Sequence, residues 1–436
     1  MRAHLLYTMR RVGYVAMLVS TSAVIAGAQL PNASTAAFAM GGNFTAMARG
    51  FEAVAWNPAN LAMPGRPFFS LGTLIGGGNV GLSPIDFTAL HKFSGQVVDS
   101  ATRVSWINAA RLAGGQRAKI DGGITPLALS VGPVGFQYGG SVYTNLNLSP
   151  DAWEAVLFGN AGNYGGQPKT LDFTGTSVRV GAFSAGALSF AIPIPIRFTR
   201  GILANEKAAI GITGKYVMGH ALVVAEDAGS ALAGSDVQLR FPLIAPDTSY
   251  DGMLGAGKGA DISLAWSGGS LKIGVLAENV FNNFTWDTTK LAYRPGTGSF
   301  NSDSSATNFD QQAYGAAPQG LRDIVAAQAF KPALSIGAAL ELTRSLTLTA
   351  DMKTYTGGDE AIVIGPRSRV GVGAEWRLLS FLPLRAGVAS VTDGWQAGAG
   401  VGLRVFGFEL GVSSAIRQIG AARSSGIMVG LVGIGR

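Results

Sequence analysis

The apolar and polar residues of the C-terminal third of the chain alternate with a period of two. Between residues 334 and 342, Leu334 and Ile336 fall on one face, whereas Ser335 and Glu341 fall on the other. The alternation resumes after each short turn. Because successive side chains of a strand point to opposite faces of a sheet, this pattern predicts a series of strands with one apolar and one polar face.

The same reading predicts fourteen strands along the chain, each next to its neighbour in sequence. A long series of hairpins with charges on one face only is typical of a closed transmembrane barrel. The predicted strands are 68–91, 125–132, 135–147, 174–198, 206–222, 257–266, 270–280, 332–342, 345–353, 368–378, 382–389, 395–404, 407–416 and 426–435.

The lengths of the connections between these strands alternate between short and long. If the polar segment 281–331 lies outside the cell, then 223–256, 148–170 and 92–124 also lie outside, and the short turns fall on the other side. Bacterial barrels have short periplasmic turns and long outer loops. The alternation therefore supports the strand count and places the C-terminus in the periplasm.

The composition agrees with a barrel. The 436 residues are 47% hydrophobic and only 14% charged, with 62 glycines and a mean hydropathy of +0.29; soluble proteins average about 25% charged residues. After the N-terminus we find no apolar run of about 20 residues, the length that a transmembrane helix needs. The predicted fold class is all-β, a transmembrane antiparallel barrel of about fourteen strands.

Residues 1–28 are predicted to be a cleaved secretory signal. Arg10 and Arg11 precede an apolar stretch over 12–25, and Ala26-Gly27-Ala28 supplies small residues for cleavage. An uncleaved membrane anchor is the alternative. Export of a barrel predicts the outer membrane of a Gram-negative-type cell. Removing 1–28 takes away three arginines and no acids, so the net charge falls from +7 to +4, which does not argue for a nucleic-acid partner.

The sequence carries no catalytic signature. It has no cysteine and three histidines, of which His4 lies in the signal and His91 and His220 stand alone. No metal-ligand spacing occurs. The segment 252–259 approaches a phosphate-binding loop, but Gly259 replaces the Ser or Thr that would hold the metal ion. We therefore predict no enzyme activity, no metal and no cofactor.

A short N-terminal segment carries the most specific signal. Residues 39–62 contain Gly41-Gly42, a run of small residues, and the triplet Asn57-Pro58-Ala59 directly before the first strand. This segment resembles the start of the FadL family of outer-membrane transporters of hydrophobic compounds, and of related PorV-like barrels. The resemblance implies a plug (hatch) over 29–66 inside a fourteen-stranded barrel over 67–436. Asn60 departs from the family, which commonly has Gly there.

The inward face of the predicted barrel combines charges of both signs with glycines. We expect most of these charges to pair across the lumen and brace the wall, and a minority to line a path for cargo. Glycine between them leaves room in the lumen. The predicted lumen residues are Lys272, Glu341, Asp351, Arg369, Arg377, Arg385 and Arg404.

Two further features are candidate sites for the entry and exit of an apolar cargo. The outer loop 281–331 carries Phe281, Phe284, Trp286 and Tyr293, which could capture a hydrophobic molecule or could pack the loop against itself. The predicted strand 174–198 contains Gly181, Gly186, Pro193 and Pro195. Because proline cannot donate to a ladder, this strand is expected to pair incompletely, which would leave either a benign bulge or a lateral opening.

Three functions follow as hypotheses. The first is passive uptake of a hydrophobic, fatty-acid-like molecule through the outer membrane, with the plug as gate. The alternative is a non-transporting scaffold or shuttle barrel, similar to PorV-type proteins, with a periplasmic or secretion-system protein as partner. The third, a lipid hydrolase, needs a Ser/His site that the sequence does not show. Outer-membrane lipid is the expected surrounding in every case.

Overall fold

The structure is a computed structural model. It describes residues 30–434 apart from 32, 160–168, 196–202, 235, 302–304, 357–361, 363–364, 393 and 420–421. The predicted signal, residues 1–28, lies outside the described residues.

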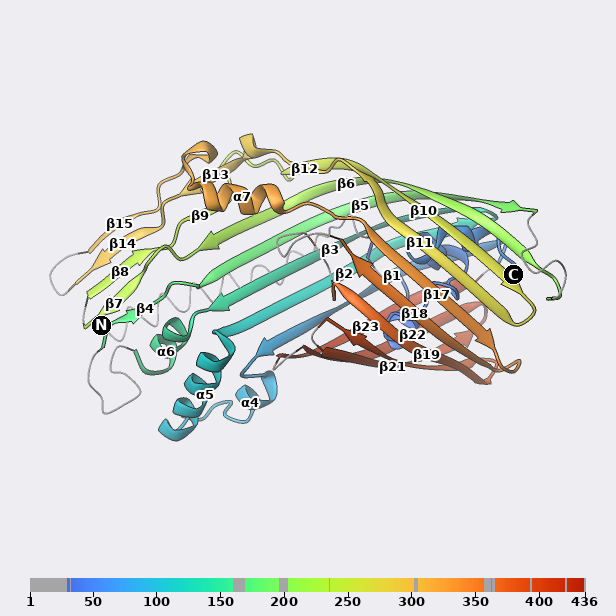
Figure 1. Cartoon of the computed structure of the whole chain (residues 1–436), viewed down its shortest axis with the longest axis horizontal. Coiled ribbons are helices and arrows are strands. Elements are labelled where there is room, and N and C mark those ends of the chain that lie inside the picture. The colour runs from blue at the N-terminus through green and yellow to red at the C-terminus, as the bar shows by residue number, and fades with distance from the viewer. Residues whose placement is uncertain are drawn as a thin grey trace.

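Fourteen antiparallel strands form a closed barrel, because the last strand pairs with the first (Figure 1). The strand count and the fold class predicted from the sequence are confirmed. The strands are β1 (Phe69–Ser83), β2 (Gln116–Val131), β3 (Val134–Leu148), β5 (Ser177–Ile194), β6 (Lys207–Glu226), β10 (Gly255–Gly268), β11 (Leu271–Asn282), β17 (Ala333–Glu341), β18 (Leu346–Tyr355), β19 (Ser368–Leu379), β20 (Leu382–Val391), β21 (Gly394–Val405), β22 (Phe408–Ile419) and β23 (Ala422–Ile434).

The first hairpin differs from its prediction. Strand β1 ends at Ser83, and the remainder of the predicted 68–91 strand contains a short helix, α4 (Phe87–His91). Strand β2 begins at Gln116, nine residues before the predicted start at 125. Its first half, Gln-Arg-Ala-Lys-Ile-Asp-Gly-Gly, lacks an apolar face, so the period-two signal was missing although the backbone pairs with β1 and β3.

The sequence predicts a capped short helix at 149–154, and the structure has it; the other elements of the long loops were not revealed by the sequence pattern. Helices α5 (Ser100–Ala113), α6 (Pro150–Phe158) and α7 (Gln319–Ala327) lie there with the short turns η4 (Thr288–Lys290) and η5 (Tyr314–Ala316). A second sheet joins β4 (Leu171–Asp172), β7 (Ala231–Ala233), β8 (Asp236–Arg240), β14 (Thr297–Phe300) and β15 (Ser305–Asn308). The other short strands are β9 (Leu243–Pro246), β12 (Thr285–Trp286), β13 (Leu291–Arg294) and β16 (Gln312–Ala313).

Apolar side chains cover the outside of the barrel. On β5, Leu188, Phe190 and Ile192 are half-exposed, whereas the alternate residues Ser189 and Ala191 are buried. The same alternation runs around the barrel. An apolar outer surface over a polar inner face is typical of a barrel that spans a bilayer. Among the described residues, no helix is long and apolar enough to cross a membrane.

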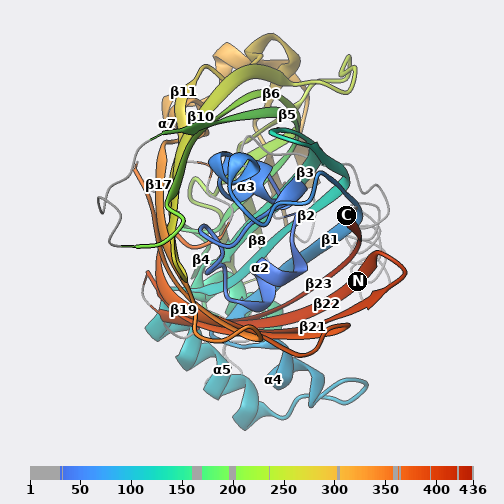
Figure 2. The same cartoon turned by 90° about the vertical axis from the view of Figure 1, so that its right-hand side faces the viewer.

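The N-terminal segment lies inside the barrel at its short-turn end. It consists of α2 (Thr35–Ala39), η1 (Gly50–Glu52), α3 (Ala53–Trp56) and η2 (Pro58–Ala62), and Figure 2 looks along the barrel onto these helices. Met40, Phe44 and Leu61 form the core of this unit, and the Phe44 and Trp56 rings meet edge to face with centroids 5.8 Å apart. We call residues 30–63 the plug.

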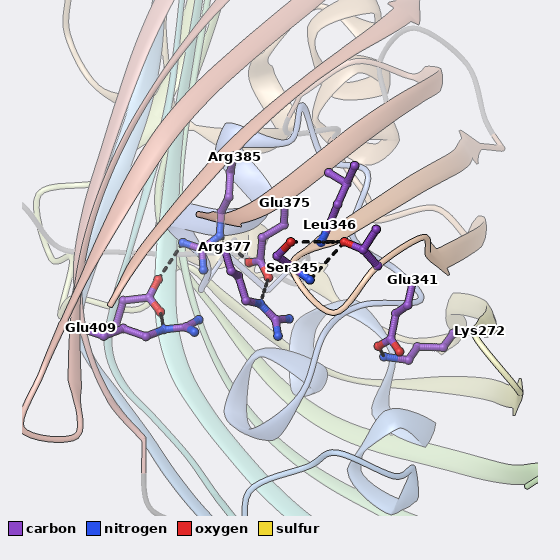
Figure 3. A network of polar contacts seen from close by, with 10 residues as sticks. Lys272, Glu341, Ser345, Leu346, Glu375, Arg377, Arg385 and Glu409 are labelled. Carbon is purple, nitrogen blue, oxygen red and sulfur yellow. Dashed lines mark hydrogen bonds and ion pairs between the residues drawn. The ribbon is translucent and has the colours of Figure 1, made fainter. Parts of the chain in front are cut away.

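An ion-pair network braces the inner wall near the short-turn end (Figure 3). Glu375 accepts hydrogen bonds from Arg377 and Arg385 at 2.8 Å each, and Glu409 accepts from Arg385 and Arg404 at 2.6 Å each. The chain of pairs crosses from β19 to β22. Four strands are therefore joined by side chains as well as by their backbone ladders.

The same view shows Lys272 of β11 pairing with Glu341 of β17 at 2.5 Å. Five of the seven predicted lumen residues thus take part in ion pairs of the wall. This is the bracing role that we expected for most of them.

Arg385 is the residue on which this network depends, because it bonds both buried carboxylates. Replacing Arg385 with Ala should lower the free energy of unfolding by about 3–5 kcal/mol, since two carboxylates would stay buried with less compensation. Urea unfolding in detergent micelles measures this. Arg377→Ala is the matched control: its side chain is 43% exposed, so the loss should stay below about 1 kcal/mol. Equal effects of the two variants would contradict the assignment.

Candidate functional site: a plugged lumen with an internal cavity

The triplet Asn57-Pro58-Ala59 fastens the plug to the wall. The Asn57 side chain caps η2, because its Oδ1 accepts from Ala59 N at 3.2 Å, and Pro58 occupies the first position of that turn. The Asn57 Nδ2 donates to the carbonyl of Leu264 on β10 at 3.1 Å. A single amide side chain therefore both caps the start of η2 and holds this turn on a strand.

Further hydrogen bonds tie the plug to other strands. Asn43 Nδ2 donates to the carbonyl of Val372 at 3.0 Å, Thr45 N donates to Asp351 Oδ1 at 3.2 Å, and Gln396 donates to the carbonyl of Gly41 at 2.6 Å. These bonds satisfy polar groups of the plug that have no access to bulk water.

The plug occupies the space beside several glycines of the inner wall. A β-carbon at Gly211 would overlap the backbone of Ala59, and one at Gly387 would overlap the backbone of Met40. The expectation that inward glycines leave room in the lumen is therefore only half right: the room exists, but the plug backbone occupies it.

The Gly41-Gly42 pair lies against a wall arginine. Both residues have positive φ, +64° and +85°, a region that favours glycine. A β-carbon at Gly42 would overlap the guanidinium of Arg369. This contact gives a physical reason for glycine at that position, because any side chain would displace either the plug or Arg369.

A cavity of about 190 Å³ lies in the lumen beside the plug. The plug contributes Phe38, Trp56 and Gly42 to its lining, and the wall contributes residues of many strands. Charged groups surround it in pairs: Lys215 with Asp261 at 2.6 Å, Lys353 with Glu278 at 2.7 Å, and Arg417 with Asp121 at 3.8 Å.

The sequence pattern placed Arg369 and Asp351 in the lumen but missed Lys215 and Asp261. These two lie on β6 and β10, where alternate glycines and alanines weaken the polar-inside pattern. Their pairing depends on the register of neighbouring strands, in which Lys215 lies opposite Gly259 and Asp261 opposite Thr213. A diagonal contact of this kind requires the register, which one sequence does not contain.

The aromatic residues of the outer loop do not form an open capture surface. Phe284 and Trp286 are 4% and 9% exposed and pack against Phe183 and Phe330 with ring centroids 5.1–5.8 Å apart. The loop is packed against itself and the inner wall, the other alternative that the sequence allowed.

The remaining two loop aromatics lie in different surroundings. Tyr293 is partly buried against the same aromatic cluster, and Phe281 is 54% exposed at the end of β11. Of the four residues predicted to capture ligand, only Phe281 is thus largely exposed.

The predicted weak strand is paired on both sides. Strand β5 forms a continuous ladder with β3 from Ser177 to Phe190, and a ladder with β6 that extends to Ile194 with one bulge beside Ala182. Gly181 and Gly186 lie within these ladders. Of the two alternatives, the described part of this strand shows the bulge, and its ladders run on past it.

The prolines of β5 lie where no ladder is interrupted. Pro193 lies beyond the last pair with β3, so its missing N–H costs no bond on that side. Pro195 follows the last residue of the strand.

The wall is irregular at another place. Register shifts fall together in β1 between Thr73 and Gly76 and in β2 between Ile124 and Leu127, where Pro126 lies inside the strand. Proline within a strand was the sequence signal for this site.

His220 has a partner that the sequence did not suggest. Its Nε2 lies 2.7 Å from Ser184 Oγ, and its Nδ1 lies 2.7 Å from the carbonyl oxygen of Gly252. Ser184 is fully buried, so its hydroxyl is out of reach of a substrate in this state. Among the described residues, no group of His, Cys, Asp or Glu could hold a metal ion. The absence of enzyme activity stays a prediction.

Lys290 fixes the turn that carries Gly252. Its Nζ donates to both carboxylate oxygens of Asp251 at 2.8 Å and to the carbonyl of Met253 at 3.0 Å. The hydrogen bond from Lys290 lowers the pKa of Asp251.

These observations define the class of protein: a fourteen-stranded transmembrane barrel whose lumen holds an N-terminal plug and a small internal cavity. No protein-family model matches the chain, and no curated protein matches it.

Solved structures similar to this chain include the Ralstonia pickettii toluene transporter TbuX, with 12% identity over 92% of this chain and 97% of that one and a TM-score of 0.47. A Pseudomonas aeruginosa FadL homologue has 11% identity over 94% and 100% of the two chains and a TM-score of 0.47. The P. putida toluene transporter TodX has 10% identity over 93% and 98% and a TM-score of 0.45. Identities of 10–12% do not show which cargo this chain carries.

The burial of Phe284 makes a prediction about the outer loop. Phe284→Ala should lower the free energy of unfolding by about 3–5 kcal/mol, because it leaves a cavity among the rings of Phe183, Trp286 and Phe330. The control is Phe281→Ala on the same segment, which should change stability by about 0.5 kcal/mol or less. Urea unfolding followed by tryptophan fluorescence compares them. A larger loss for Phe281→Ala would contradict the packing described.

Proposed function

We propose that this protein mediates passive uptake of a hydrophobic small molecule through the outer membrane, with the plug as gate. The observation that carries the proposal is the cavity enclosed between plug and wall. Cargo held there contacts Phe38 and Trp56 of the plug and residues of the wall at the same time. A shift of the plug would therefore change the cavity and the lumen below it together.

The manner in which the plug is held supports a gating role. Several of its contacts to the barrel are hydrogen bonds from Asn43, Thr45 and Asn57 to wall groups, and water can replace each of these. Each such bond contributes a net of about 0.5–1.5 kcal/mol, so the plug is held stably in the lumen but can dissociate from the wall reversibly.

The charges around the cavity favour a cargo with an apolar body and one polar group over a pure hydrocarbon. A fatty-acid-like molecule is such a cargo. The scaffold alternative predicts instead a barrel without bound small molecule and with a stable protein partner. Native mass spectrometry of detergent extracts distinguishes the two.

The seat of the plug can be tested from the wall side, without changing the plug itself. Gly211→Ala places a methyl group against the backbone of Ala59 and should loosen the plug, raising the frequency or size of openings in single-channel recordings. Gly214→Ala is the matched control on the same strand, because its added β-carbon meets nothing within 4 Å, and it should behave as wild type. A Gly211→Ala barrel that conducts like wild type would show that plug seating does not control passage.

A further inference from the structure

Arg369 of β19 is a buried cation without a hydrogen-bonding partner at two of its nitrogens. The residue is 9% exposed, lines the cavity, and has neither a hydrogen bond nor an ion pair to its Nε or Nη2 from the described residues. Its guanidinium lies over the Trp56 ring at 5.9 Å. A buried guanidinium without a partner is costly, so this arrangement points to a ligand.

A second donor lines the same cavity. The hydroxyl of Tyr355 on β18 is buried and lines the cavity, and the Lys353 ammonium lies beside it, 4.8 Å from the centre of its ring. Because an ammonium can only donate, the proton of the hydroxyl stays available to a ligand. Lys353 lies directly opposite Arg369 in the β18–β19 register. Tyr355, two residues further along β18, is on the same face of that strand. Two available donors on adjacent strands, the Arg369 guanidinium and the Tyr355 hydroxyl, therefore line one cavity.

The other cations that line the cavity already have carboxylate partners. Lys215, Lys353 and Arg417 each lie beside a carboxylate. Asp351, which also lies near Arg369, accepts from the plug at Oδ1 through Thr45 N and has no hydrogen bond at Oδ2. It does not line the cavity. Arg369 is thus the cavity-lining cation, among those described, that is left for an anionic ligand.

The free nitrogens define the shape of that anion. Nε and Nη2 lie on one edge of the guanidinium, and two parallel N–H donors at that spacing match the two oxygens of a carboxylate. The Tyr355 hydroxyl adds a third donor.

The cavity is also small. A volume of about 190 Å³ is below the roughly 300–1,000 Å³ of sites for drug-sized ligands, so a compact molecule fits and a long acyl chain does not. Phe38 and Trp56 supply aromatic surface to its lining.

We propose that this cavity is a binding site for an aryl carboxylate of one ring, with benzoate as the simplest member. The carboxylate bonds Arg369 Nε and Nη2 and the Tyr355 hydroxyl, and the ring lies against Phe38 and Trp56. The proposal rests on the proposed function for the route of the cargo, but binding itself does not require transport. It narrows the acid-bearing cargo to a compact aromatic acid.

Isothermal titration of the whole detergent-solubilised protein with benzoate tests the site, with benzyl alcohol and hexadecanoate as comparison ligands. Wild type should bind benzoate more tightly than either. Arg369→Gln should weaken benzoate binding by about tenfold or more, the worth of a charge-assisted hydrogen bond, and Tyr355→Phe by a few-fold. Neither variant should change the affinity for benzyl alcohol, which lacks the charge.

Arg369→Lys is the matched variant that keeps the charge but lacks the two parallel N–H donors of the guanidinium. Its affinity for benzoate should lie between those of wild type and Arg369→Gln. Heat-dependent migration on gels verifies that each barrel is folded. Benzoate that binds Arg369→Gln as tightly as wild type, or binds no better than benzyl alcohol, would overturn the proposal.

Tighter binding of hexadecanoate would also overturn the proposal while leaving uptake of a hydrophobic molecule in place. Conversely, benzoate binding together with an unaltered Gly211→Ala conductance would retain the site and remove the gate.

Discussion

The structure depends on how a wide barrel fills its own interior. Fourteen strands enclose more volume than the inward side chains of the wall can fill, and every backbone group placed inside must find a partner. The plug meets both conditions. Its backbone lies directly on wall positions that have no side chain, such as Gly211 and Gly387. Its Asn43 and Asn57 side chains donate to wall carbonyls, and its Gly41 carbonyl accepts from the wall residue Gln396.

This solution divides the lumen along its length into layers of different chemistry. The short-turn end is braced by the network around Arg385, and the plug lies within that end. The cavity and its ring of ion pairs come next, and a packed aromatic cluster centred on Phe183 and Phe284 fills the lumen toward the long loops. Charged pairs of the described residues therefore lie around the cavity between the plug and the aromatic cluster, which is why we propose a cargo that carries a polar group.

The barrel could be predicted because alternation is a local property of the sequence. Leu188, Phe190 and Ile192 fall on the outside whatever their neighbours are. The cavity could not, because it depends on contacts between distant residues. Arg369 was predicted to face the lumen, but its two nitrogens without a hydrogen bond depend on its distances to Asp351 and the other groups around it, and those require coordinates. Likewise, the aromatic sequence around Phe284 is compatible with exposure or packing, and only the position of Phe183 and Phe330 decides between them.

The central claim is that the plug moves when the barrel opens, and a removable tether tests it most directly. The chain has no cysteine, so Thr35→Cys and Gly411→Cys add the only pair; the two β-carbons would lie 2.9 Å apart, a small shift from the roughly 3.5–4.5 Å of disulfides. In single-channel recordings the oxidised protein should show no openings, and a reductant should restore the openings of wild type. Identical openings in the oxidised and reduced states would contradict the account.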